Sequence, residues 1–217
     1  MATLALDTSS AISVALLDGD EVLARDSVFA PRGHAELLAP MIRGVLARAG
    51  VAPHGDVGRS GIDRIVVGTG PAPFTGLRVG LVTAKTLALA WGVPVLGVCS
   101  LDALGAAHGG PVTVVADARR REVYWARYEG GERVDGPAVS VPADVPSSGG
   151  SFVGRGAVLY PEVFGDAPPA SSWDPDPAWL ARIAEQRLTG APVAGAGDLG
   201  IDPLYLRRPD VHGTPPS

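Results

Sequence analysis

Cysteine, histidine and lysine are scarce in this sequence. Cys99 is the only cysteine in 217 residues, which excludes a disulfide within the chain and fits a reducing cytoplasm. The four histidines include no pair at the i, i+4 spacing of a helical metal site, and neither an HExxH nor a CxxC motif occurs, so we expect no metal centre. Cys99 lies in the apolar stretch VLGVCSL without an adjacent basic group. It is expected to be a core residue rather than a nucleophile.

Long uncharged hydrophobic runs and a strong positive charge are also absent. No run of about 18 uncharged apolar residues occurs that could span a membrane. The first residues, MATLALDTSS, lack the basic start of a signal peptide and predict a strand, so we expect a cytoplasmic chain. The formal net charge of -5 argues against broad binding of a polyanion by this chain alone.

Hydrophobic patterning predicts an α/β lobe over residues 1–102. Two apolar runs flank the turn at 18–20, a strong hairpin signal, and with residues 3–7 they predict three consecutive antiparallel strands. Apolar residues at helical spacing predict a helix over 36–49. Further along, the pattern predicts a buried strand at 62–68, a helix at 75–91 and a strand at 93–100.

Residues 103–217 are predicted to form a second lobe, whose C-terminal segment packs back on the first. The stretch VVADARRREVYWARY predicts two strands joined by a polar tip at 118–121. Its arginines and aromatic residues leave RNA binding as an alternative to a solvated hairpin tip, which the acidic chain favours. Residues 135–151 are predicted to be a loop, and DPAWLARIAEQRLTG an amphipathic helix capped by Asp174 or Asp176. The tail at 212–217 is predicted to be disordered.

The helix expected at 75–91 is apolar on nearly every side. A helix of this kind is usually buried on two sides, one of them packed on the sheet. The other side packs either within the chain or on another chain, and the pattern alone leaves both open. With the helix at 36–49 beside it, we expect an apolar platform for a partner, formed by Leu37, Met41, Val45, Leu77, Leu81, Ala84 and Ala88.

Five segments, taken in chain order, resemble the bacterial TsaB (YeaZ) family. They are ALDTSS at 5–10, GHAELLAPMI at 33–42, GPAPFTGLRVG at 70–80, VVADARRREVYWA at 114–126 and PLYLRR at 203–208. The resemblance runs over nearly the whole chain, and Phe74–Arg78 is its most specific part. It implies an α/β, actin-like, two-lobed fold of the sugar-kinase and chaperone-ATPase type.

The same resemblance implies a role and a set of partners. In this family the chain is a non-catalytic relative of TsaD, the subunit that transfers a threonylcarbamoyl group to N6 of the adenosine beside the anticodon in tRNA. It pairs with TsaD through helices of its first lobe. An ATPase subunit, TsaE, then binds the pair. The chain is expected to contact tRNA only as part of this complex. A homodimer is expected when the chain is isolated. No cofactor is required by the chain, and a nucleotide at the subunit junction is left open.

Six residues are interpreted as the remnant of an actin-like phosphate loop: Asp7, Thr8, Ser9, Gly70, Thr75 and Gly76. The family usually has Gly-Pro-Gly-Ser-Phe-Thr-Gly, whereas this chain has Ala72 and Pro73 at the third and fourth positions. Alanine disfavours a positive φ, and proline removes an N–H that could face a phosphate. Both changes weaken a phosphate-binding role.

The sequence leaves open two alternatives to a subunit without catalytic residues. Asp7 could serve a nucleotide-binding ATPase or phosphotransferase as a magnesium-side carboxylate, although a polar turn explains it as well. A glycoprotease-type peptidase is less favoured, because no GxSxG motif occurs. TsaD holds a metal through a His-x-x-x-His pair, but Leu38 stands at the second of these positions here, so His34 is expected to be a polar residue at a helix entry.

Overall fold

Three consecutive antiparallel strands and two parallel strands form the first sheet. β1 (Ala2–Asp7) pairs antiparallel with β2 (Ile12–Asp18), and a turn with Gly19 at φ 56° leads into β3 (Glu21–Val28), as predicted. β4 (Arg64–Gly68) and β5 (Val95–Val98) continue the sheet in parallel, giving the order β3-β2-β1-β4-β5. The computed structural model describes residues 1–30, 33–51, 61–147, 149–190 and 199–207. The tail predicted at 212–217 lies outside these ranges.

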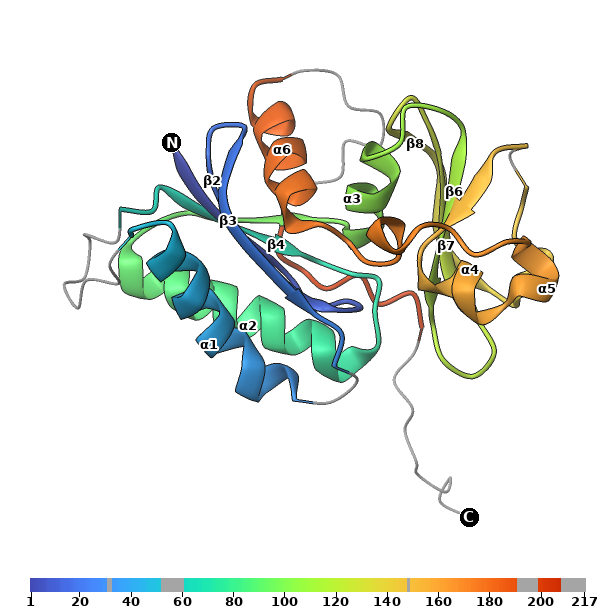
Figure 1. Ribbon diagram of the computed structural model, residues 1–217, viewed down its shortest axis with the longest axis horizontal. Coiled ribbons are helices and arrows are strands. Elements are labelled where there is room, and N and C mark those ends of the chain that lie inside the picture. Colours follow the sequence, from blue (N-terminus) through green and yellow to red (C-terminus); the bar gives the residue numbers. More distant parts are fainter. Residues whose placement is uncertain (31–32, 52–60, 148, 191–198, 208–217) are drawn as a thin grey trace, which may run out of the picture.

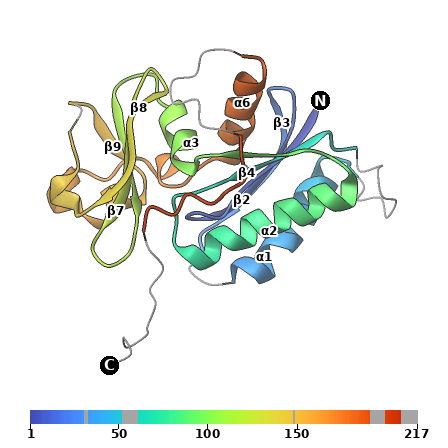
Figure 2. The same cartoon turned by 180° about the vertical axis from the view of Figure 1, so that it is seen from behind.

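Helices cover both faces of the first sheet. α1 (His34–Arg48) and α2 (Phe74–Trp91) lie side by side on one face (Figure 1). α3 (Ser100–Ala106) and α6 (Pro177–Leu188) lie on the other (Figure 2). Alternate residues of β1 point to the two faces, so Leu4 and Leu6 join the core under α1 and α2, and Ala5 joins the core under α6. In the part of the chain that the structure describes, no helix is long and apolar enough to cross a membrane.

The second sheet has four strands in the order β8-β7-β6-β9. They are β6 (Val112–Asp117), β7 (Val123–Glu129), β8 (Glu132–Ser140) and β9 (Ser151–Val153). Only β6 and β9 pair in parallel. Short helical segments follow or flank the sheet: Pro142–Asp144, α4 (Arg155–Leu159), α5 (Pro161–Phe164) and Ala170–Ser172.

The loop predicted at 135–151 is partly wrong. β8 continues to Ser140 and pairs with β7 as far as Val123, although it contains Gly136 and Pro137. β8 lies at the edge of the sheet, where the missing N–H of a proline breaks no ladder hydrogen bond. The patterning also missed α3, α4 and α5, which are too short to show helical periodicity.

The chain returns from the second lobe to the first through α6. Asp176 caps this helix, its Oδ1 accepting a hydrogen bond of 2.9 Å from the backbone N–H of Ala178, whereas Asp174 binds Arg155 instead. Leu180 and Ile183 of α6 are buried against the first sheet. The division of the chain at residue 102 stays a prediction.

Candidate functional site

A cleft of about 630 Å³ opens between the two lobes. The first lobe lines it with the loop after β1 and the first turns of α1 and α2. The second lobe contributes the end of β6, Arg119 and part of α4. Polar residues at the ends of β1 and β6 therefore line one cavity, at 8–10 from the first lobe and at Asp117 and Arg119 from the second.

Asp7 lies behind the cleft rather than in it. The carboxylate is fully buried and accepts hydrogen bonds from Ser100 Oγ (2.5 Å), Ser9 Oγ (2.6 Å) and the Ser9 N–H (2.7 Å). Burial raises the pKa of Asp7, and the bonds from Ser100 and Ser9 act in the opposite direction. A Cβ on Gly68 would lie 1.8 Å from Asp7 Oδ2, so only glycine fits beside this carboxylate. The carboxylate oxygens of Asp7 therefore bind neighbouring residues of the fold, and Asp7 does not line the cavity.

The three hydroxyls of the loop after β1 are likewise bonded within the protein. Thr8 Oγ1 donates to the carbonyl of Gly76 (2.9 Å), Ser9 Oγ to Asp7, and Ser10 Oγ to Asp174 (2.6 Å). Helix α2 can pack closely against Thr8 because Gly80 has no side chain. A Cβ on Gly80 would lie 2.4 Å from Thr8 Oγ1. The loop thus joins α2 to the sheet, with few groups left to hold a ligand.

The loop before α2 forms one end of the cleft. Gly70 has φ 85°. Its N–H donates a hydrogen bond to Ser100 Oγ, and its carbonyl accepts one from the backbone N–H of Ser100. Ala72 is buried and, unlike Gly70, does not have a positive φ, so the substitution causes no backbone strain here. Pro73 stands directly before α2 without a side-chain capping bond, and Pro73, Thr75 and Gly76 line the cleft. The assignment of these residues to a former phosphate loop stays a prediction.

His34 is the first residue of α1 and also lines the cleft. Its ring packs against the backbone of α2, because a Cβ on Gly76 would lie 3.2 Å from His34 Nε2. Partial burial lowers the pKa of this imidazole. In the described ranges, no cluster of three or more His, Cys, Asp or Glu side chains suited to a metal ion occurs.

Five of the seven residues predicted to face a partner lie in the core instead. Leu77, Leu81, Ala84 and Ala88 form the inward side of α2, and Val45 the inward side of α1; each is at most 6% exposed. The apolar face of the first sheet covers them, since residues at i, i+4, i+7 and i+11 form the stripe that a helix packs on a core. Their burial in the isolated chain leaves these five little surface to offer a partner, and their assignment to the partner surface stays a prediction.

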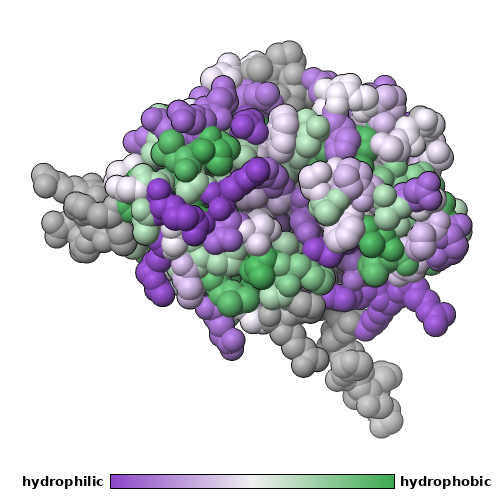
Figure 3. All heavy atoms as spheres, viewed as in Figure 1, coloured by the Kyte–Doolittle hydropathy of each residue, from purple (hydrophilic) through white to green (hydrophobic). Residues whose placement is uncertain are grey.

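The outward sides of α1 and α2 carry a different apolar set. Val82 and Leu89 of α2 are 61% and 84% exposed, and Leu37 of α1 is 37% exposed. Met41, also predicted for the partner surface, is half-buried. Apolar surface covers part of the first lobe on the side of these helices (Figure 3). We call Leu37, Met41, Val82 and Leu89 the outer helix face.

Sequence reasoning missed an ion pair of the second lobe that contacts the first lobe beside the cleft. Arg155 of α4 binds Asp174 through two bonds of 2.6 Å, and its guanidinium lies 3.4 Å from the ring centre of Phe29, at the end of the first sheet. Ser10 donates to the same carboxylate. Each partner lies far from the others in sequence and carries no motif, so no local signal could have shown the contact.

The thiol of Cys99 is expected to be unreactive. Burial raises its pKa to about 12, and Cys99 is 5% exposed. At pH 8 the thiolate fraction should be on the order of 10³-fold below that of an unfolded cysteine, whose pKa is about 8.5, and alkylation by iodoacetamide should slow at least as much. Mass spectrometry of native and urea-unfolded protein measures both rates. Equal alkylation rates, or loss of tRNA modification with a folded Cys99→Ala variant, would indicate that Cys99 is a reactive thiol.

Comparisons with known proteins agree with this architecture. The sequence profile of the family described as "TsaD: tRNA N6-adenosine threonylcarbamoyltransferase" matches residues 28–148. A protein of Mycobacterium leprae is 41% identical over 214 residues, which span 96% of this chain and 55% of the relative. The "tRNA threonylcarbamoyladenosine biosynthesis protein TsaB" of Bacillus subtilis is 35% identical over 134 residues, 59% of this chain and 56% of the relative. The chain thus spans about half the length of these two proteins.

A solved structure matches over nearly the full length of both chains. "YeaZ from Pseudomonas aeruginosa" superposes with a TM-score of 0.75 and 32% identity, covering 94% of this chain and 99% of that one. With the two mixed sheets and their helices, this confirms the predicted fold class, a two-lobed α/β fold of the actin-like type. Family profile, named relative and structure agree: the chain belongs to the TsaB (YeaZ) family.

Proposed function

We propose that the chain is a non-catalytic subunit in the synthesis of threonylcarbamoyladenosine in tRNA. In this proposal it pairs with a TsaD-type catalytic subunit, a TsaE-type ATPase joins the pair, and the complex acts in the cytoplasm. The name of the Bacillus subtilis relative supports the pathway. The observation that carries the scaffold role is the outer helix face, an apolar surface on helices whose other sides already pack on the sheet.

The outer side of α2 has the composition of a contact surface. Val82, Thr86 and Leu89 recur at helical spacing, and the helix contains no acidic residue. Arg78 and Lys85 are its only charged residues. Val82 and Leu89 in water cost free energy that burial against a partner would recover, at roughly 25 cal/mol per Å². When the catalytic subunit is absent, the same face would pair two copies of this chain.

The cleft supports a structural rather than a catalytic role. The carboxylate of Asp7 and the hydroxyls of Thr8, Ser9 and Ser10 are all hydrogen-bonded within the protein. Magnesium binding or activation of a phosphate would require these oxygens to leave their present partners. No cofactor is assigned to the chain, and a nucleotide held jointly with the catalytic subunit would need groups from that subunit.

Reconstitution tests this function. Unmodified tRNA, a threonylcarbamoyl adenylate source, the TsaD-type and TsaE-type subunits and ATP should give threonylcarbamoyladenosine only when this chain is added, as measured by mass spectrometry of the digested nucleosides. The chain alone, with Mg²⁺ and ATP, should release no phosphate at a sustained rate. Sustained release that Asp7→Asn abolishes would support the runner-up, an ATPase or phosphotransferase working in the interlobe cleft.

A further inference from the structure

The C-terminal segment, residues 199–207, runs from the first lobe to the second (Figure 2). It begins at the edge of the first sheet, where the N–H of Gly97 in β5 donates a hydrogen bond to the carbonyl of Leu199 (2.8 Å). A Cβ on Gly97 would lie 2.1 Å from the carbonyl oxygen of Gly200, so the segment can lie this close to β5 only because the position is glycine. The first sheet is thus shaped to receive a segment that comes far later in the chain.

Side chains of this segment pack on the cores of both lobes. Ile201 packs on the core under α1 and α2. Leu204 and Leu206 pack on the core that α3 shares with the second sheet. The N–H of Leu204 also donates to the carbonyl of Thr69 (2.9 Å), in the loop that leads to α2. Since the side chains of an extended chain alternate in direction, Tyr205, between the two leucines, faces α2 rather than the second core.

Tyr205 binds the first turns of α2. Its ring stacks on Phe74, with 4.6 Å between the ring centres, and its hydroxyl accepts a hydrogen bond of 3.0 Å from Arg78 Nε. The guanidinium of Arg78 lies 3.5 Å from the centre of the Phe74 ring, so the three side chains form one cluster. Aromatic stacking and cation–π contacts both depend on close geometry, so a shift of α2 relative to the segment would break them.

Arg207 holds the next part of the segment to the second lobe. It donates to the carbonyl of Ala118 (3.1 Å) and pairs with Glu122 (2.6 Å), at the hairpin tip between β6 and β7. Ala118 stands between two residues that line the cleft from the second lobe, whereas Phe74 lines it from the first. Tyr205 and Arg207 therefore bind opposite walls of the cleft.

We propose that residues 199–207 act as a strap that holds the start of α2 to the second lobe and sets the width of the interlobe cleft. Because Tyr205 and Arg207 are two positions apart, the walls that they bind cannot separate while both contacts last. The other contacts between the lobes would remain after release, so the cleft would widen at the start of α2 while the lobes stay attached. This strap is a property of the chain alone and does not depend on the proposed function.

Hydrogen exchange followed by NMR measures the release of the strap. The amide of Leu204, bonded to Thr69, should exchange ahead of the buried amides of α6, because the strap opens without global unfolding. In the variant Tyr205→Ala/Arg207→Gln its exchange should become about tenfold faster, since a stacking contact and an ion pair no longer hold the segment. Arg48→Gln is the matched control, because Arg48 also binds a backbone carbonyl and a carboxylate, but within the first lobe. It should leave the exchange of Leu204 unchanged.

Double electron–electron resonance measures the cleft itself. Nitroxide labels on Thr75→Cys of α2 and Glu162→Cys of α5 stand at exposed positions of the two lobes. Cys99 is buried and stays unlabelled in the folded protein. Release of the strap should shift the label distances to longer values or broaden them, whereas Arg48→Gln should keep the distances of the wild type.

A single substitution carries the test if the double variant does not fold. Arg207→Gln removes only one partly exposed ion pair, so the core is kept and the exchange of Leu204 should rise about threefold. Exchange of Leu204 at the rate of the α6 amides would overturn the strap, because the segment would then open only with the whole protein. Label distances that stay as in the wild type while Leu204 exchanges faster would overturn it as well, because the segment would then not set the width of the cleft.

Discussion

Replacing Asp102 with alanine is expected to lower the free energy of unfolding by about 3–5 kcal/mol, because it removes the shared partner of two buried guanidinium groups. Asp102, on α3, is 5% exposed. It accepts hydrogen bonds from Arg187 (2.7 Å) and the hydroxyl of Tyr128 (2.8 Å), and Arg133 lies 3.5 Å away. Chemical denaturation followed by circular dichroism measures the change.

A surface pair provides the control for this prediction. Asp135 lies 3.6 Å from Arg127 and its side chain is 46% exposed, so Asp135→Ala should cost at most about 1 kcal/mol. Both variants remove a carboxylate from arginine, but Asp102 is buried with three partners, whereas Asp135 is exposed and pairs with one arginine. If Asp102→Ala were no more destabilising than Asp135→Ala, the buried cluster would not be a main contributor to stability.

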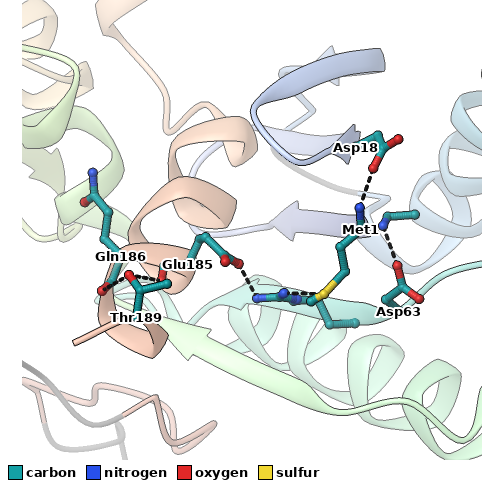
Figure 4. Close-up of polar contacts among 8 residues, drawn as sticks. Met1, Asp18, Asp63, Glu185, Gln186 and Thr189 are labelled. Atoms are coloured by element: carbon teal, nitrogen blue, oxygen red, sulfur yellow. Dashed lines mark hydrogen bonds and ion pairs between the residues drawn. The ribbon is translucent and has the colours of Figure 1, made fainter. Parts of the chain in front are cut away.

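The Asp102 cluster matters because it joins elements of both lobes. Arg187 comes from α6 on the first sheet, whereas Tyr128 and Arg133 come from β7 and β8 of the second. Helix α6 is also attached to the first sheet by Glu185, which pairs with Arg64 of β4 beside Met1 (Figure 4). Together with the contacts of Ser10 and Phe29 to the Arg155–Asp174 pair, these interactions fix the two lobes to each other.

Local patterns predicted most of the first lobe, and long-range contacts account for what they missed. The hairpin around Gly19 and the cap at Asp176 depend on a few neighbouring residues, so both could be read from the sequence. The Asp102 cluster joins side chains 26 to 85 positions away, which no local pattern shows. β8 passes through Pro137 only because that strand lies at the edge of its sheet, a fact of topology.

The burial of α2 shows what the sequence pattern could not decide about this helix. A helix that is apolar on nearly every side gives a weak periodic signal, so patterning indicated two buried sides without saying which one meets the sheet. The stripe chosen for the partner, Leu77 to Ala88, is the better packed one and lies on the sheet. The positive φ of Arg119–Arg121 had no sequence signal, because arginine is an unusual residue for that conformation.

The double substitution Val82→Glu/Leu89→Glu should abolish association through the outer helix face and leave the fold intact. Both side chains are exposed in the isolated chain, at 61% and 84%, so the introduced charges remain in water. The free energy of unfolding should therefore change by at most about 0.5 kcal/mol per site. In a complex, each carboxylate would lose water without gaining a partner. The affinity for the catalytic subunit, or for a second copy, should fall at least about 100-fold, the equivalent of about 2.8 kcal/mol.

Two further variants make this result specific to the outer helix face. Ala84→Glu places a carboxylate on the inward side of α2, at 0% exposure, and should unfold the protein rather than release a folded monomer. Leu188→Glu adds a charge at an exposed leucine of α6, on the opposite face of the sheet, and should change neither stability nor association. Size-exclusion chromatography with light scattering, run beside thermal melts, distinguishes these outcomes. A folded Val82→Glu/Leu89→Glu variant that pairs with the affinity of the wild type would show that association uses another surface, because two unpartnered charges cannot be buried there without cost.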